Sequence, residues 1–274
     1  MTTIINDVKL DFSDVLFVPQ RSSWDTNDTL ESRSKIELER TFTFKYSRHQ
    51  LRVIPIIAAN MDTVGTIPMA NSLASFNMMT ALHKFYGAGE LRMHFISSSY
   101  TSFYTIGTSD DDWLKLSSIM CANDHGPKLI CLDVANGYTE KFFSRIKRIR
   151  NQWGDNVVIM AGNVVSPEVT IEAIRAGADI VKVGIGSGSV CTTRKVAGVG
   201  YPQFSAVLEC ANAAHSQGAH ICSDGGVVHI ADVAKAFGAG ADFVMCGGLF
   251  AGHDECGGEK VYPKNVEELS LIHI

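Results

Sequence analysis

A cysteine stands in a loop that is too rich in glycine to pack a core. The segment KVGIGSGSVCTTR, residues 182–194, places Cys191 after a short apolar run, with Gly186, Gly188 and Thr193 nearby in the sequence. A cysteine among glycines can be exposed and lies near backbone amides, which are the conditions that stabilise a thiolate and let it attack an electrophile. Most cysteines are instead small buried hydrophobes. The sequence is therefore compatible with two roles for Cys191, a nucleophile or an incidental loop residue.

Two glycine pairs and an aspartate indicate where a phosphorylated sugar could bind. Gly225 and Gly226 in SDGG, and Gly247 and Gly248 in CGG, each follow an apolar run. Glycine pairs at such points can bind a phosphate through their backbone N–H groups. Asp224 precedes the first pair, and because a carboxylate would repel a phosphate, its more natural partner is a ribose hydroxyl. The alternative is that Asp224 only caps the following helix.

Two charged residues follow other apolar runs. Lys84 in HKF could meet an anionic ligand, and Asp133 in LDVANGY could accept hydrogen bonds from hydroxyl or amide groups. Each of them could equally be half of an ordinary structural ion pair.

Eight short apolar or β-branched runs must position these residues. They alternate with seven longer helix-like stretches, which is typical of a parallel sheet built from βα units. The runs are 53–60, 78–82, 102–107, 128–135, 157–163, 179–185, 219–226 and 242–248. Eight such units predict an α/β protein with a TIM (β/α)8 barrel rather than an open doubly wound sheet. Nearly every run ends in small, polar or charged residues, and in a barrel these ends meet on one face and form a single site.

The bulk composition excludes several classes of protein. The 274 residues are 46% hydrophobic and 19% charged, which is the range of a globular protein with a full core. A formal net charge of −5 argues against nucleic-acid or anionic-membrane partners. No stretch approaches the roughly 18 apolar residues of a membrane helix. Seven cysteines, an odd number without a CxxC pair, favour a cytoplasmic protein over a disulfide framework or a zinc site.

Over roughly residues 6–259 the order of several motifs resembles the IMP dehydrogenase/GMP reductase family. The motifs are NDVKLDFSDVL, PIIAANMDTVGT, ICLDVANGY, IMAGNVV, VKVGIGSGSVCTTRKVAGVGYPQ, SDGG, DVAKAFGAGADFVM and AGHDECGGE. Two features favour the reductase branch: LDVANGY itself, and the short segment from Phe85 to Lys128, where dehydrogenases usually carry an insertion of two cystathionine-synthase-type (CBS) modules. The resemblance implies a single barrel domain, 1–274, with an N-terminal extension, 1–52, and no CBS insertion.

The resemblance also implies a reaction and its participants. GMP and NADPH would give IMP, ammonia and NADP, in purine nucleotide salvage, and family members are typically homotetramers. By this likeness Cys191 attacks C2 of the guanine ring, ammonia leaves, and the covalent thioimidate accepts a hydride from NADPH. Thr193 matches the proton-handling threonine of the family, although a hydroxyl needs a neighbouring acid or base to act in general catalysis.

The binding residues of the family are carried over position by position. The ribose and phosphate of GMP would contact Asp224, Gly225, Gly226, Gly247 and Gly248. NADPH would contact Ser32, Arg33, Lys84, Asp133, Val134, Ala135, Ile185 and Gly186. A monovalent cation, usually potassium, would take the carbonyls of Gly186, Gly188 and Cys191. No GxGxxG fingerprint follows a strand, so NADPH would lie across the barrel mouth and not on a Rossmann unit.

This sequence departs from the family pattern in two places. Ser187 stands where the family usually has proline, which would fix φ in the loop. After Glu259 the family continues with a phosphate and base loop, a flap that carries a catalytic glutamate, and the eighth barrel helix. Here the sequence reads KVYPKNVEELSLIHI. We therefore expect an atypical tail, 260–274, a missing or replaced eighth helix, as in a C-terminally truncated chain, and weak or absent activity of this polypeptide.

Two other functions stay open at this point. One is an IMP dehydrogenase, which would reduce NAD in the presence of IMP. The other is a catalytically incompetent subunit that binds nucleotide or joins full-length partners.

Overall fold

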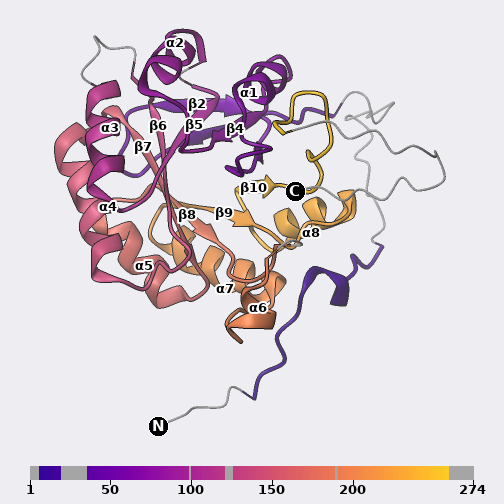
Figure 1. Cartoon of the computed structure of the whole chain (residues 1–274). Coiled ribbons are helices and arrows are strands. Elements are labelled where there is room, and N and C mark those ends of the chain that lie inside the picture. The colour runs from indigo at the N-terminus through magenta and orange to yellow at the C-terminus, as the bar shows by residue number, and fades with distance from the viewer. Residues whose placement is uncertain (1–5, 20–35, 99, 121–125, 189–190, 259–274) are drawn as a thin grey trace, which may run out of the picture.

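Eight parallel strands close into a barrel (Figure 1). The computed structural model describes residues 6–19, 36–98, 100–120, 126–188 and 191–258. The strands are β3 (Ile56–Ala58), β4 (Met79–Leu82), β5 (Ser102–Ile106), β6 (Leu129–Asp133), β7 (Val158–Val164), β8 (Ile180–Val183), β9 (His220–Asp224) and β10 (Phe243–Cys246). Their order is β10-β3-β4-β5-β6-β7-β8-β9, and β10 pairs with β3 to complete the ring. Each strand overlaps one of the eight predicted runs, so the predicted TIM barrel is confirmed.

Helices follow the strands and surround the barrel (Figure 1). They are α1 (Ile67–Ala74), α2 (Ala88–Ser98), α3 (Asp110–Met120), α4 (Glu140–Trp153), α5 (Pro167–Ala176), α7 (Gln203–Ser216) and α8 (Ile230–Gly238). Helix α4 begins after Thr139, whose side chain accepts a hydrogen bond from the backbone N–H of Phe142. An extra short helix, α6 (Thr193–Val196), follows β8 and was not predicted. Across the described ranges, none of the helices has both the length and the apolar character needed to span a bilayer.

The barrel interior and its outer surface are both packed with apolar side chains. In β5, Phe103 belongs to the interior cluster, whereas Tyr104 and Ile106 pack in the layer between the strands and the helices. Successive side chains of a strand point to opposite faces, and here both faces are buried. This double burial explains why the sequence shows continuous apolar runs instead of an alternating pattern.

A two-stranded hairpin covers the end of the barrel where the strands begin. Strand β1 (Arg40–Thr43) pairs antiparallel with β2 (Gln50–Val53), which places Phe42 opposite Leu51. The Phe42 ring packs on Phe243, the first residue of β10, at 4.3 Å between ring centroids. The apolar pattern predicts only an extension before residue 53 and includes Val53 in the first barrel run. That assignment is wrong, because Val53 ends β2 and β3 starts at Ile56.

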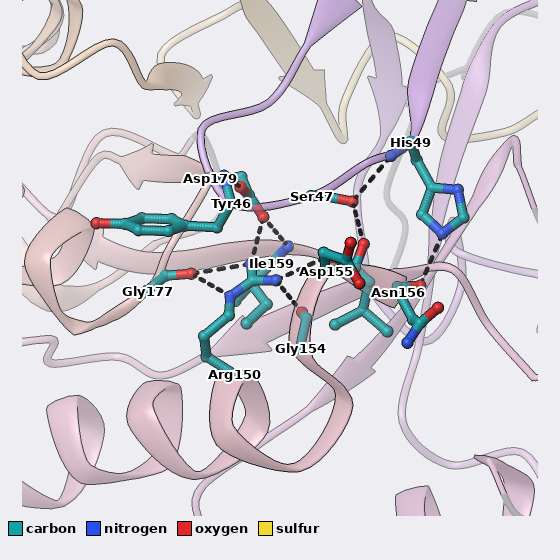
Figure 2. A network of polar contacts seen from close by, with 11 residues as sticks. Tyr46, Ser47, His49, Arg150, Gly154, Asp155, Asn156, Ile159, Gly177 and Asp179 are labelled. Atoms are coloured by element: carbon teal, nitrogen blue, oxygen red, sulfur yellow. Dashed lines mark hydrogen bonds and ion pairs between the residues drawn. The ribbon is translucent and has the colours of Figure 1, made fainter.

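Polar contacts fix the loop between β1 and β2 against the barrel (Figure 2). The carboxylate of Asp179, fully buried just before β8, accepts the backbone N–H groups of Tyr46 at 2.9 Å and of Ile159 at 2.9 Å. Arg150 of α4 lies 2.5 Å from the same carboxylate and also donates to the carbonyl of Gly177. The hydrogen-bonding groups of Asp179, Arg150 and these backbone atoms therefore pair with one another and hold the hairpin on this face of the barrel. A site is expected on the opposite face, where the strands end.

Beyond β10, residues 247–258 form turns. The predictions of an atypical tail and of a missing or replaced eighth helix concern residues 260–274, which lie outside the described residues. They stay predictions.

Candidate functional site

A cavity of about 560 Å³ opens at the ends of the barrel strands. Its walls come from residues in or just after the last part of β6, β7, β8, β9 and β10 and from residues that follow β3, so segments far apart in the sequence meet there. This is the face on which (β/α)8 barrels build their active sites. The predicted site residues that line the cavity are Asp133, Val134, Ala135, Ile185, Gly186, Gly188, Cys191, Thr193, Asp224, Gly225, Gly226, Gly247 and Gly248.

One predicted cofactor residue lies outside this cavity, and two others lie outside the described residues. Lys84 is exposed and lies outside the lining, where its ammonium sits 5.8 Å from the centre of the Phe85 ring. Ser32 and Arg33 lie outside the described residues. In the described ranges, no group of three or more His, Cys, Asp or Glu side chains is placed to hold a metal ion.

Cys191 is half-buried at the cavity wall and has a hydroxyl beside its sulfur. Its Sγ lies 3.2 Å from Oγ1 of Thr193, the first residue of α6. Hydrogen bonding to the side chain and backbone of Thr193 lowers the pKa of the Cys191 thiol from its ordinary value, and the nearby Arg194 acts in the same direction. The thiolate is the nucleophilic form of cysteine. This sulfur thus lines the cavity, and its surroundings make the thiolate easier to form than in an ordinary cysteine.

The other cysteines of the barrel strands have a different environment. Cys131, Cys222 and Cys246 are buried in β6, β9 and β10. Burial raises the pKa of both Cys131 and Cys246 to about 12. These thiols therefore stay protonated at neutral pH, which separates them chemically from Cys191.

Arg194 ties the loop of Cys191 to the N-terminal segment. Its guanidinium binds both carboxylate oxygens of Asp11, at 2.9 and 3.2 Å, and donates to the carbonyl of Tyr201 at 2.6 Å. Asp11 in turn accepts the backbone N–H of Gln203, the first residue of α7, at 2.6 Å. Helix α6, through Arg194, and the start of α7, through Gln203, are thereby anchored to one carboxylate.

The turn after β9 touches the loop after β8 through its backbone. Gly225 has φ of +90°, a conformation that favours glycine. A Cβ on Gly225 would lie 2.6 Å from Oγ of Ser187 and 3.0 Å from the backbone nitrogen of Gly188. The absence of a side chain at Gly225 is what allows the two loops to meet. This contact brings the predicted sugar-phosphate residues beside the loop of Cys191.

A lysine that the sequence analysis missed joins two of the predicted residues. The ammonium of Lys182 in β8 lies 2.6 Å from Oδ1 of Asp133 and 2.6 Å from Oδ2 of Asp224. The Lys182 side chain is only 2% exposed, whereas both aspartates reach the cavity. The sequence signal was available, because a lone lysine in the buried run DIVKVGI requires a partner.

Two amide side chains near this cluster were also missed as site residues. Asn163 donates to Oδ2 of Asp224 at 2.9 Å and to the carbonyl of Gly184 at 2.6 Å. Asn163 lines the cavity, and its Oδ1 is buried without a hydrogen-bond partner among the described residues. Gln203 donates to the carbonyl of Val183 at 2.9 Å and anchors the end of β8 to α7.

Comparisons with known proteins place this chain beside nucleotide-converting enzymes. The family described as "IMP dehydrogenase / GMP reductase domain" matches residues 99–268. GMP reductase of Caenorhabditis elegans is 52% identical over 265 residues, covering 95% of this chain and 72% of that protein. GMP reductase of Enterobacter sp. (strain 638) is 53% identical, covering 98% and 76%.

A solved structure shares the same fold. Inosine 5′-monophosphate dehydrogenase from Legionella pneumophila superposes with a TM-score of 0.77 at 32% identity. The match covers 92% of this chain and 73% of that one.

Proposed function

The chain belongs to the IMP dehydrogenase/GMP reductase family, and from this premise we propose that it is a reductase that converts GMP to IMP and ammonia with NADPH. The observation that carries the proposal is the placement of Cys191, whose sulfur faces a cavity shared with the Asp224–Gly226 turn and lies 3.2 Å from Thr193 Oγ1. Relatives named GMP reductase at 52–53% identity support the reductase branch.

In the proposed reaction the Cys191 thiolate forms a bond to C2 of guanine. The C2 amino group takes up a proton and leaves as ammonia, which gives a thioimidate on Cys191. NADPH, when bound, supplies the hydride that C2 requires. The carbon–sulfur bond then breaks, IMP is released and the thiolate is regenerated. Thr193 Oγ1 is close enough to the sulfur to exchange a hydrogen bond with it in each state.

The chemistry of the cavity residues fits a nicotinamide cofactor. Val134, Ala135 and Ile185 offer apolar surface next to the carboxylate of Asp133. An apolar wall suits a nicotinamide ring, and a carboxylate accepts hydrogen bonds from ribose hydroxyls. These residues would hold the NADPH, and Lys84 would reach it only from outside the cavity lining.

The loop of Cys191 also fits the proposed potassium ion by its ligand type. Gly186, Gly188 and Cys191 belong to one loop, and backbone carbonyls are ligands that potassium takes in proteins. The Gly188 carbonyl accepts the Cys191 N–H at 3.0 Å and has a second lone pair. We also propose a cytoplasmic homotetramer in purine salvage, which agrees with the free thiols of the six described cysteines.

The test is the covalent adduct. The purified protein is incubated with GMP, quenched with acid and measured by intact mass, and NADPH consumption and ammonia release are followed in parallel. We expect an adduct with the mass of GMP less ammonia, located on Cys191. Cys191→Ser should abolish the adduct and reduce any turnover by more than about a thousandfold. Cys256→Ser, which alters the other half-buried cysteine among the described residues, is the matched control. An adduct that persists in Cys191→Ser would refute the proposal.

The structural likeness to an IMP dehydrogenase supports that enzyme as the second candidate. It predicts reduction of NAD with IMP and no ammonia release from GMP, so the same protein preparation separates the two. A nucleotide-binding subunit without catalysis predicts binding of GMP, no adduct, and co-purification with a complete partner.

A further inference from the structure

The buried ammonium of Lys182 touches both predicted ligand sides of the described cavity. Asp133 was assigned to the cofactor side and Asp224 to the nucleotide side, and each has an oxygen 2.6 Å from Lys182 Nζ. These two oxygens therefore cannot be farther apart than twice that distance. Asp133 is 35% exposed and Asp224 is 21% exposed, so both carboxylates face the cavity while the lysine lies beneath them.

The barrel is built to accommodate this lysine. Lys182 pairs in register with Gly162 of β7, and a Cβ on Gly162 would lie 2.5 Å from Cβ of Lys182. Asp224 Oδ2 accepts from both Lys182 and Asn163, which leaves its Oδ1 for another donor. The arrangement carries a net charge of −1 and keeps carboxylate oxygens available at the cavity surface.

We propose that Lys182 is a positioning residue that holds Asp133 and Asp224 ionised and turned toward the cavity, so that each accepts hydrogen bonds from the hydroxyl groups of a bound ligand. The identity of the two ligands, a purine nucleotide and a nicotinamide dinucleotide, rests on the proposed function. The ionic arrangement does not depend on it.

The electrostatics of the cluster support this role. Burial, the largest single influence, would raise the pKa of Asp133, but Lys182 together with Asn60 and Lys84 brings that pKa below its ordinary value. Burial would lower the pKa of Lys182, and the two carboxylates raise it well above the ordinary value. Without the ammonium, two half-buried carboxylates this close would repel each other, which disfavours the ionisation of both at once. A protonated carboxyl is a weaker acceptor for a ligand hydroxyl.

Other titratable groups near the cluster do not replace Lys182. The thiols of Cys131 in β6 and Cys222 in β9 face the ammonium, and burial raises the pKa of each above its ordinary value. Lys84 acts on Asp133 from the exposed loop after β4, and Asn60 is a neutral hydrogen-bond partner of Asp133.

The experiment measures the affinity of each ligand separately by calorimetry, with GMP and with NADPH. Lys182→Met removes the ammonium and retains most of the side-chain volume, and should weaken both ligands by about 10- to 100-fold. Asp133→Asn should weaken mainly NADPH, and Asp224→Asn mainly GMP. In a double-mutant cycle, Lys182→Met and Asp133→Asn should be clearly non-additive for NADPH. Lys147→Met, at an exposed lysine of α4, is the matched control.

Two readouts distinguish positioning from a purely structural role. Between about pH 6.5 and 9, the affinities of Lys182→Met for GMP and for NADPH should change more than those of the wild type. The reason is that Asp133 and Asp224 would share a proton in this variant and lose it over that pH range. A Lys182→Met protein with wild-type affinities and pH dependence would overturn the proposal. If that variant does not fold, the test is carbon NMR of the carboxyl groups of Asp133 and Asp224 in the wild-type protein as the pH is changed. Titration of either carboxylate near neutral pH would contradict the proposal that Lys182 keeps both ionised. A wild type that binds neither ligand would defeat the proposed function, while the NMR result still tests Lys182.

Discussion

Replacing Asp11 by alanine removes three hydrogen bonds that anchor the segments around α6. Oδ1 and Oδ2 of Asp11 accept from the two terminal nitrogens of Arg194, and Oδ1 also accepts the backbone N–H of Gln203. Arg194 directly follows Thr193, and Gln203 opens α7. We expect Asp11→Ala to destabilise the protein and to loosen the start of α7.

The size of the effect follows from exposure and capping. The Asp11–Arg194 pair is about one third exposed on both sides, 35% and 36%, so screening limits it to about 0–1 kcal/mol. The N-cap of α7 is Pro202, which offers no side-chain acceptor, so Asp11 supplies the cap to Gln203 from another segment. Loss of a capping acceptor costs about 1 kcal/mol. The total of about 1–2 kcal/mol should lower Tm by about 2–8 °C.

Thermal unfolding and hydrogen exchange measure this prediction. Asp11→Ala should lower Tm by that amount and speed amide exchange in the first turn of α7. Asp11→Asn retains an acceptor for Gln203 and should lose less. Arg52→Met, which removes an ion pair with Glu39 on the hairpin, should leave exchange in α7 unchanged. Unchanged Tm and exchange in Asp11→Ala would refute the reasoning.

Three further predictions concern the loop after β9, the hairpin face and the barrel interior. Gly225→Ala, at φ +90° and with no room for a Cβ, should cost about 1–3 kcal/mol, and a wild-type urea midpoint would contradict this. Burial alone would lower the pKa of His220, but hydrogen bonding to Asp242 and to the Thr43 carbonyl raises it. Its stabilisation is therefore complete below the unfolded pKa of about 6.5 and is lost as the pH rises through the raised folded value. Between about pH 6 and 9 the free energy of unfolding should fall further in the wild type than in His220→Gln. If the two plots of unfolding free energy against pH are parallel, protonation of His220 does not contribute to stability. Phe103→Ala, at a fully buried position, should cost about 3–5 kcal/mol by chemical denaturation, and a loss below about 1 kcal/mol would show that the interior collapses around the gap.

The strands could be predicted because burial on both faces leaves a strong local pattern. Segments such as SFYTIG and DIVKVGI are rich in aromatic and β-branched residues over a strand length, and a glycine follows each strand closely. The hairpin escaped prediction because only Phe42, Leu51 and Val53 of its two short strands are buried, among exposed neighbours. Its stability comes from packing on the barrel, which no local pattern reports.

The candidate site divides in the same way. Cys191 and the glycine pairs were visible because a thiol in a glycine-rich loop and side-chain-free strand ends are unusual local chemistry. Lys182 gave a local signal, but its partners did not, because Asp133 and Asp224 are 49 residues before it and 42 residues after it in the sequence. The role of the N-terminal segment was likewise hidden, since Asp11 reaches Arg194 across 183 residues.

The sequence by itself determined the kind of protein: eight buried strands alternating with helices, a number of units that fits a closed barrel better than an open sheet, with a thiol after one strand. Only the tertiary structure decided which charged side chains form ion pairs, as Lys182 does with Asp133 and Asp224. It also decided which loops touch, as the turn at Gly225 touches the loop after β8. Those contacts depend on distances of a few ångströms between residues far apart in the chain, and closure of the ring sets these distances.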